Sequence, residues 1–173
     1  MRVLARAARA EGPEVQAVPA WRIALSGVLS LLGLGLSTYL TVAHFVGAGI
    51  LECAGNGVIN CTKVTTSPQS YVFGIPVAVL GLGYWVVMTA LNSPWAWRSA
   101  DRRIHVARLT LSVLGIGFVL YLLSAELLII GAICIYCTGV HIVTFAQLVL
   151  VMATVPAMLG WGRAPTAGAA RRR

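Results

Sequence analysis

The sequence predicts an all-α integral membrane protein, a bundle of four transmembrane helices with a capping loop on the extracytoplasmic (periplasmic) side. Of its 173 residues, 58% are hydrophobic and 10% are charged, whereas soluble domains are typically about 45–50% apolar and about 25% charged. Four long apolar runs follow one another along the chain, and the basic residues flank these runs. Basic residues in such positions are typical of the cytoplasmic ends of membrane helices.

The net charge of +8 does not indicate nucleic-acid binding. The basic residues gather at the two termini and in one internal connection. They are not interleaved with aromatic side chains, as a surface that stacks bases would require. We therefore expect membrane lipid, and no nucleic acid, around the chain.

The composition divides the chain into three parts. Residues 1–22 form a cytoplasmic N-terminal tail, residues 23–159 form the membrane domain, and residues 160–173 form a cytoplasmic basic tail. The N-terminal tail is rich in Ala and Arg and contains two prolines. It is either disordered or forms a short helix that lies on the membrane surface.

The four predicted spans are about residues 23–45, 75–91, 104–129 and 134–159. The apolar stretch of the first span is longer than the about 7–15 residues of a signal peptide, so we expect it to be retained. Pro76 is expected in the first turn of the second helix, where its missing N–H is no loss. A tight turn near Gly131 separates the last two helices.

Small and polar residues recur along the first span at steps of three and four, which places them on one helix face. They are Ser26, Ser30, Gly33, Ser37, Thr41 and His44. Such a stripe lets neighbouring membrane helices approach closely. His44 ends the stripe, either as an interfacial histidine without chemistry or as part of a site.

The connections between the spans differ in length and composition. Residues 46–73 form the long polar loop, and the run after Cys61 has the composition of one short helix. Irregular backbone of this kind lies outside the lipid or is covered by protein. The 92–103 connection is short and basic, with Trp95 and Trp97 as expected interfacial anchors.

Charge bias predicts the orientation. Of the 13 Lys and Arg residues, only Lys63 lies outside in a four-span topology, and the other 12 lie on the side of the termini. The termini are therefore expected in the cytoplasm. The chain is predicted to be a multi-pass protein of the bacterial inner membrane, with all four cysteines near the oxidising extracytoplasmic face.

Four cysteines allow three pairings, and the spacing alone does not choose among them. They are Cys53, Cys61, Cys134 and Cys137. Two static disulfides would staple the loop, whereas a redox pair would exchange its disulfide. A structural zinc site is a weaker alternative, because the first pair lacks the usual ligand spacing. Haem attachment requires His after the second cysteine of C-x-x-C, and Thr138 stands there.

The last span carries a polar stripe that favours the redox alternative. Its members are Cys134, Cys137, His141, Thr144 and Leu148, at steps of three and four. Ionisable groups inside a membrane are costly and indicate function, and a helix N-terminus favours a thiolate. Glu126, near the outer end of the third span, either supplies protons at this place or reaches headgroup water.

These residues together resemble the bacterial members of the vitamin K epoxide reductase family. The matching features of the first loop are the C-x₇-C pair, the serine six residues later, and the Phe-Gly pair before the second helix (Cys53 and Cys61, Ser67, Phe73 and Gly74). The C-x-x-C at the start of the last helix completes the match, which covers residues 23–158. DsbB-type proteins carry C-x-x-C in the first outer loop, so the order here argues against that family.

The resemblance implies a four-helix bundle around a quinone, capped by the 46–73 loop. In its terms Cys53 would exchange with a thioredoxin-like partner, and Cys61 would relay electrons through a transient disulfide with Cys134. Cys137 would be the thiolate that faces the quinone.

Further site positions follow from the same resemblance. Ser67 stands where the family has Ser or Thr near the active site. His141 stands where the animal enzymes have a tyrosine that touches the quinone ring. Ser70 replaces an asparagine that bonds the quinone in the animal enzymes, and this departure favours quinone reduction over epoxide reduction. His141, Ser70 and Glu126 are the candidate cofactor-binding residues.

The sequence thus predicts a VKOR-like thiol:quinone oxidoreductase. It would reoxidise a DsbA-type thioredoxin-fold partner and pass the electrons to menaquinone or ubiquinone, which supports disulfide bond formation in exported proteins. Many bacterial members carry a fused thioredoxin domain, and few residues follow the last span here, so a separate extracytoplasmic partner is expected. No metal is expected. The alternatives are a non-catalytic, disulfide-stapled membrane scaffold or complex subunit, and a small carrier or channel.

Overall fold

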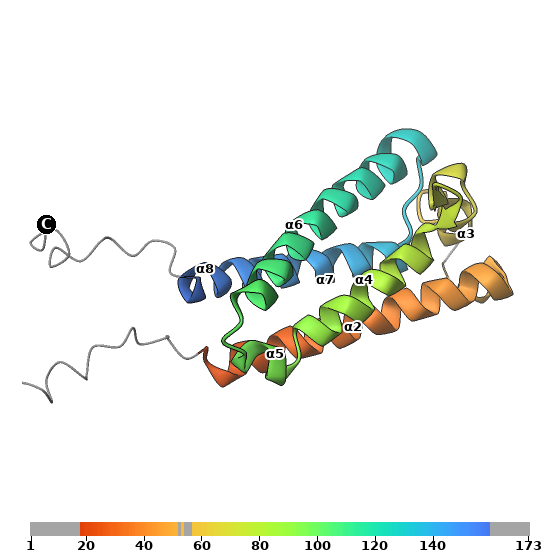
Figure 1. The fold of residues 1–173 in the computed structure, drawn as a ribbon. Helices are drawn as coiled ribbons and strands as arrows, with labels where there is room; N and C mark the ends of the chain where they lie inside the picture. Colours follow the sequence, from red (N-terminus) through yellow and green to blue (C-terminus); the bar gives the residue numbers. More distant parts are fainter. Residues whose placement is uncertain (1–17, 52, 54–56, 160–173) are drawn as a thin grey trace, which may run out of the picture.

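The computed structural model describes residues 18–51, 53 and 57–159. Four long helices form a bundle, and short elements cover its two ends (Figure 1). In chain order the elements are α2 (Ala20–Val46), the 3₁₀ turn η1 (Ala48–Ile50), α3 (Cys61–Thr65), the 3₁₀ turn η2 (Pro68–Ser70), β1 (Tyr71–Val72), β2 (Ile75–Pro76), α4 (Val77–Leu91), α5 (Pro94–Arg98), α6 (Arg102–Ser124), the π-helix η3 (Ala125–Ile130), α7 (Ile135–Met152) and α8 (Val155–Met158).

Three helical segments are long and apolar enough to cross a membrane: Ala20–Val46, Arg102–Ile130 and Ile135–Met158. The apolar helix α4 has 15 residues. At about 1.5 Å per residue it is about 22 Å long, less than the about 30 Å of a hydrocarbon core. Its start also differs from the sequence prediction, because Pro76 pairs in β2 and is the N-cap of α4 instead of lying in its first turn. The fourth span therefore stays a prediction.

Helix α2 packs against both α4 and α7. The buried positions on α2 include Ser26, Ser30, Gly33 and Ser37. A Cβ atom at Gly33 would overlap the indole ring of Trp85 on α4, so glycine is what lets the two helices approach at this point. The predicted small-residue stripe is confirmed over these positions, and Thr41 and His44 at its end are half-buried.

The connection between α4 and α6 corrects one expectation. Trp97 was expected as an interfacial anchor, but it is 2% exposed, whereas Trp95 is 76% exposed. Both residues lie on the one-turn helix α5. Residues two apart on a helix point about 200° away from each other, so one indole faces outward while the other is buried.

The loop after Cys61 contains the predicted short helix, α3. After it, β1 and β2 pair as a two-residue antiparallel hairpin. The turn of this hairpin consists of Phe73 and Gly74, both with positive φ, at 51° and 79°. The hairpin thus reverses the chain just before α4 begins.

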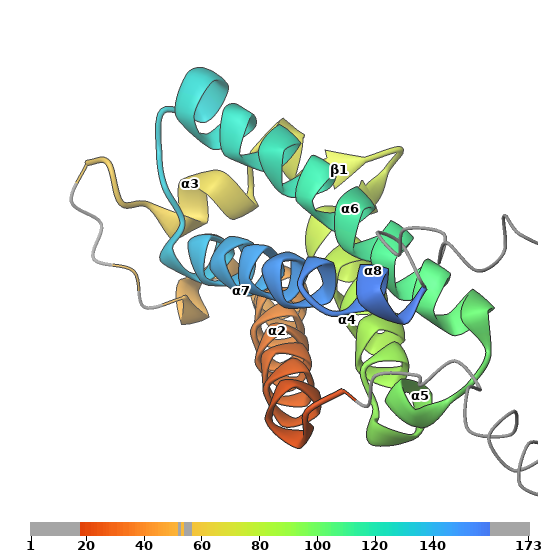
Figure 2. The ribbon, with the colours of Figure 1, turned by 90° about the vertical axis from the view of Figure 1, so that its left-hand side faces the viewer.

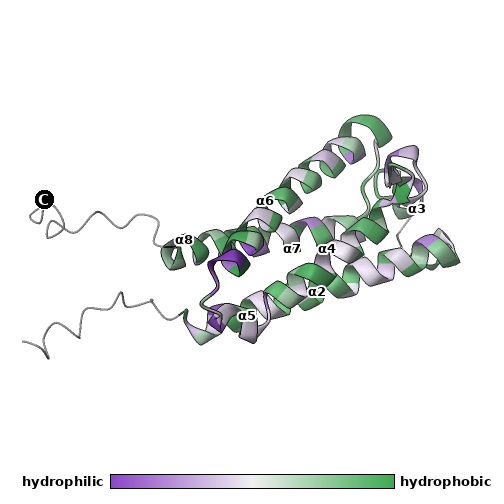
Figure 3. Ribbon diagram, viewed as in Figure 1, coloured by the Kyte–Doolittle hydropathy of each residue, from purple (hydrophilic) through white to green (hydrophobic). Residues whose placement is uncertain are grey.

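The two ends of the bundle carry different elements. Both ends of the described chain lie at the same end as α5, and α3 lies at the opposite end (Figure 1). Figure 2 shows α7 between α2 and α6, in agreement with its contacts to both. Hydrophobic residues follow the lengths of the helices, and hydrophilic residues are most prominent around α5 and the start of α6 (Figure 3). This distribution is that of a helical membrane protein.

Candidate active site

All four cysteines meet at the α3 end of the bundle. Cys61 and Cys134 are fully buried in one cluster, and Cys53 and Cys137 pack against it. Cys53 and Cys61 form a disulfide with their Cα atoms 5.8 Å apart. Cys134 and Cys137 are free thiols. The two pairs that are far apart in sequence therefore form one sulfur cluster.

A parallel β-bridge holds this cluster together, because it joins the segment that leads to Cys61 with the segment that leads to Cys134. The Asn60 N–H donates to the Ile133 carbonyl at 3.0 Å, and the Ile133 N–H donates to the Val58 carbonyl at 2.8 Å. The backbone therefore sets the position of one cysteine relative to the other.

Local hydrogen bonds shape the loop side of the site. The Asn60 side-chain oxygen accepts the Lys63 N–H at 2.9 Å and so caps α3. The Ser67 hydroxyl donates to the Val64 carbonyl at 2.8 Å, and the Ser70 hydroxyl donates to the Ser67 carbonyl at 2.6 Å. Both serine protons are therefore used within the loop.

The start of α7 holds the second cysteine pair. Cys134 is the N-cap residue of α7, and its Sγ accepts the Cys137 N–H at 3.4 Å. A hydrogen bond from the Cys137 side chain is the main cause that lowers the pKa of Cys134, against burial and the charge of Glu126, which raise it. Hydrogen bonds to a thiolate at a helix N-terminus favour its charged form. Negative charge in the pair is thus favoured on Cys134, next to the predicted quinone-facing Cys137.

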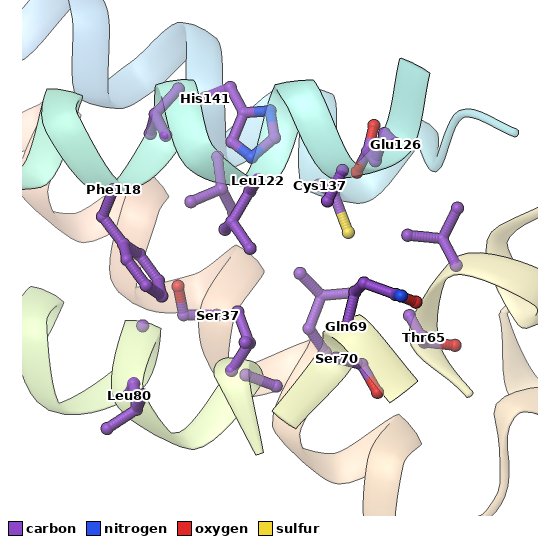
Figure 4. A pocket seen from close by; sticks show the side chains of 18 of the residues that line it. Ser37, Thr65, Gln69, Ser70, Leu80, Phe118, Leu122, Glu126, Cys137 and His141 are labelled. Atoms are coloured by element: carbon purple, nitrogen blue, oxygen red, sulfur yellow. The ribbon is translucent and has the colours of Figure 1, made fainter. Parts of the chain in front are cut away.

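A cavity of about 340 Å³ opens beside the cysteines, lined by residues of α2, α4, α6, α7 and the α3–η2 loop. Cys137 and His141 point into it (Figure 4). Most of its lining is apolar, with side chains such as Leu40, Leu80 and Phe118. Its size lies within the range of small-molecule sites, about 300–1,000 Å³.

A comparison with known protein families identifies the family of the chain. The model of the vitamin K epoxide reductase family matches residues 24–152. The chain belongs to this family. None of the curated proteins compared with the chain matches it. As a member of the vitamin K epoxide reductase family, the chain is a membrane oxidoreductase that acts through thiols.

Five of the eight predicted site residues line the cavity, whereas Cys53, Cys61 and Cys134 lie in the buried sulfur cluster. Those that line it are Ser67, Ser70, Glu126, Cys137 and His141. Glu126 is 3% exposed and His141 is 8% exposed. The alternative in which Glu126 reaches headgroup water is therefore contradicted, because its side chain is buried against the cavity.

Four buried polar atoms of residues that line the cavity have no hydrogen-bond partner in the described part of the chain. They are Oη of Tyr84, Nε1 of Trp85, Oε2 of Glu126 and Nδ1 of His141. An unpaired buried polar atom costs about 1–3 kcal/mol, so groups of this kind mark a place where a ligand binds. Ser70 differs from them, because its proton already bonds to the loop backbone.

Sequence reasoning missed Tyr84. Its ring fits beside Gly115 on α6, where a Cβ atom would overlap the hydroxyl. The contact joins two helices that are separate in sequence, so no local pattern predicts it. The one feature of the sequence that could have indicated Tyr84 is its hydroxyl group within the apolar run of α4.

The cavity fits the quinone that the family uses. A quinone is a flat apolar ring with two carbonyl oxygens, and the site offers apolar walls with a few open polar atoms. Tyr84, Glu126 and His141 are the residues that would hold its polar groups. Over residues 18–51, 53 and 57–159, no group of three or more His, Cys, Asp or Glu side chains is placed to hold a metal ion.

Proposed function

We propose that the chain reoxidises a DsbA-type thioredoxin-fold partner and passes the electrons through its two cysteine pairs to a membrane quinone. The quinone is menaquinone or ubiquinone, and the reaction supports disulfide bond formation in exported proteins. One observation carries the proposal: a disulfide and a dithiol share one buried cluster beside an apolar cavity.

The loop pair meets the partner. Cys53 is half-buried, whereas Cys61 is fully buried, so the partner's thiolate reaches Cys53 first. Its attack on Cys53 releases the Cys61 thiolate, which attacks Cys134 of an oxidised helix pair and releases Cys137. The partner's second thiol then frees Cys53, and Cys53 displaces Cys134 from Cys61.

This exchange balances. The partner loses two electrons and two protons and gains a disulfide. The helix pair gains the two electrons and two protons and becomes a dithiol, and the loop disulfide forms again. The described state, with Cys53–Cys61 closed and Cys134 and Cys137 free, corresponds to the end of this half of the cycle.

The helix pair then delivers the electrons to the cavity. A bound quinone accepts two electrons and two protons there. Cys137 faces the cavity, and the thiol of Cys134, one turn away, closes the disulfide with it. His141 offers its unpartnered Nδ1 to a carbonyl oxygen, which orients the ring and stabilises charge on that oxygen.

The redox potentials set the direction. DsbA-type proteins have potentials of about −120 mV, and about 30 mV corresponds to about 1.4 kcal/mol for two electrons. The final acceptor must therefore have a potential above about −120 mV. Glutathione does not meet this condition, whereas membrane quinone does. The basic residues near the termini favour a cytoplasmic location for that end, which leaves the cysteine cluster on the extracytoplasmic side.

The test is an assay of partner oxidation coupled to quinone reduction in purified protein. All four single Cys→Ala variants should lose activity with the reduced partner. A small dithiol that enters at the helix pair should still reduce quinone in Cys53→Ala and Cys61→Ala, and should not do so in Cys137→Ala. Full activity of Cys137→Ala would refute the assignment.

The scaffold alternative makes a different prediction. A static staple gives no turnover and no disulfide between the loop pair and the helix pair. Trapping with Cys53→Ala, followed by mass mapping, should yield a Cys61–Cys134 species if the relay operates. The two free thiols beside a cavity support the relay, because two static disulfides would leave none.

A further inference from the structure

We infer that Glu126 is the proton carrier of this site: its carboxyl group takes a proton from the Cys134–Cys137 dithiol and donates it to the ligand in the cavity. The inference rests on the proposed function, since it assigns a second catalytic group to that reaction. It is drawn from the position of the carboxyl group and from the backbone that holds it.

The chain turns Glu126 inward by a π-helix. In η3 the side chains of Ala125 and Glu126 are buried, whereas those of Leu127, Leu128 and Ile129 are exposed. π-Helical turns are rare in proteins, and those that occur are often at functional sites. The segment thus directs one carboxyl group into the bundle while its apolar neighbours face outward.

The same turn ties Glu126 to the thiol pair. The Glu126 backbone carbonyl accepts the N–H groups of Gly131 and Ala132, the latter at 3.2 Å. Gly131 has a φ of 62°, and this left-handed residue ends the π-helix three residues before Cys134. The Cys134 backbone N–H faces the Glu126 carboxyl group. The turn therefore keeps the carboxyl group close to the first helix cysteine.

One carboxyl oxygen stays open. Oε2 of Glu126 is buried and has no partner in the described part of the chain. The Glu126 carboxyl group and the Cys137 thiol both line the same cavity (Figure 4). Glu126 is also the one acidic residue among the described residues that line this cavity. The Glu126 carboxyl group thus lies beside both the thiol pair and the ligand space.

The chemistry requires such a group. Two thiols form a disulfide by losing two electrons and two protons, and a quinone becomes a hydroquinone by gaining both. The Glu126 carboxylate accepts the proton of Cys134, on which negative charge is favoured, and donates it from Oε2 to the ligand. The Cys137 thiol, which faces the cavity, gives its own proton to the ligand as the disulfide closes. Both protons and both electrons of the dithiol thus reach the ligand, and Glu126 returns to its starting state.

The first test measures quinone reduction by a small dithiol in the full chain. Glu126→Gln keeps the shape but carries no proton, and its rate should fall by about 100-fold or more. Glu126→Asp should retain part of the rate. Asp101→Asn makes the same carboxyl-to-amide change at the other end of α6, where Asn also caps a helix, and its rate should be unchanged.

Thiol exchange between the partner and Cys53–Cys61 is followed on the same samples, because it does not require the cavity and so reports a folded loop. A wild-type rate in Glu126→Gln overturns the inference. A wild-type protein that does not reduce quinone at all overturns the proposed function instead.

The second test does not depend on quinone. Infrared difference spectra are recorded on quinone-free protein while a soluble oxidant closes the helix pair. A carboxyl band should shift on oxidation in wild type and in Asp101→Asn, and it should be absent in Glu126→Gln. Oxidation without any carboxyl band overturns the inference, even where Glu126→Gln is inactive for another reason.

Discussion

The bundle contains two buried polar regions, one at each end, and they differ in how their polar groups are paired. At the cysteine end, Tyr84, Glu126 and His141 leave atoms unpaired beside a cavity. At the α5 end, polar side chains of α2, α4, α5, α6 and α7 bond to one another, and we call this set the far-end cluster. Its members are Ser26, Ser30, Asn92, Trp97, His105, Arg108 and Gln147.

Two serine hydroxyls accept hydrogen bonds from the amide and indole groups of the far-end cluster. Ser26 Oγ accepts from Trp97 Nε1 at 3.3 Å and from Gln147 Nε2 at 3.1 Å. Ser30 Oγ accepts from Asn92 Nδ2 at 3.1 Å. One acceptor oxygen of Asn92 and one of Gln147 stay unpaired, but each side chain donates to a partner. The cluster thus joins α2 to three other elements.

The charged member of the far-end cluster is held by neutral groups. Arg108 is fully buried, its Nε donates to the Leu91 carbonyl at 3.1 Å, and its guanidinium lies 3.6 Å from the Trp97 ring. Its Nη1 donates to His105 Nδ1 at 2.9 Å. Leu91 is the last residue of α4, where the helix dipole attracts a cation. The cavity does not reach these residues.

The contrast teaches how to separate structural from functional polar groups in a membrane bundle. Both regions are buried, so burial does not distinguish them. The far-end cluster uses its donors internally and does not line the cavity, whereas the cysteine end leaves polar groups open to the cavity. The far-end cluster should therefore govern stability, and the cysteine end should govern activity.

The largest expected effect breaks the far-end cluster. Ser26→Ala leaves two buried donors without an acceptor, at about 1–3 kcal/mol each, so the free energy of unfolding should fall by about 3 kcal/mol. Quinone reduction by the folded protein should not change. Unfolding in detergent measures this, with Thr38→Ala as the control, since Thr38 is an exposed residue of the same helix. Equal losses in both variants would contradict the assignment.

The matching change at the cysteine end is His141→Leu. It removes a side chain whose Nδ1 has no partner in the described part, so stability should not fall. Quinone reduction should drop by about 100-fold, which corresponds to about 2.7 kcal/mol, because a donor to a charged oxygen is lost. Parallel unfolding and steady-state assays measure both quantities. An unchanged rate together with lower stability would place His141 among the structural groups.

The sequence predicts features that depend on neighbouring residues better than features that depend on contacts between distant segments. The helices and the short helix after Cys61 follow from local periodicity and composition, and the sequence predicts them to within a few residues. The polar face of α7 was predicted as well, and His141 and Thr144 line the cavity. The prediction continued this face to Leu148, but the fully buried residue is Gln147. Gln147 lies about 100° around the helix axis from Leu148, and it is buried because its Nε2 donates to Ser26 Oγ on α2, a partner that the sequence of α7 alone does not indicate.

The features that sequence did not predict are contacts between distant segments. They are the β-bridge between Ile59 and Ile133, the fit of Tyr84 beside Gly115, and the burial of Trp97. Each depends on a second element that the local sequence does not identify. The distinction between open and paired polar groups belongs to this class too, because it depends on which partner lies opposite each side chain.

A smaller effect is expected where the loop joins α7. Asn60→Ala removes the cap of α3, and a lost cap typically costs about 1 kcal/mol. The backbone bridge to Ile133 remains, so the Cys61–Cys134 exchange should slow without stopping. Rapid-mixing assays of partner oxidation measure the slowing. Asn60→Asp keeps a capping oxygen and should match wild type, and an equal defect in both variants would show that the cap is not the cause.

The smallest effect is expected at Ser70, which lines the cavity but bonds to the loop. Its hydroxyl donates to the Ser67 carbonyl, so Ser70→Ala should cost about 0.5–1.5 kcal/mol of stability. Because that proton is not open to the cavity, the KM for quinone should stay within about twofold of wild type, less than the effect of a lost hydrogen bond. Steady-state kinetics over a range of quinone concentrations measures this. A large rise in KM with unchanged stability would mean that the hydroxyl turns to the ligand, and Ser70 would then join His141 among the open groups.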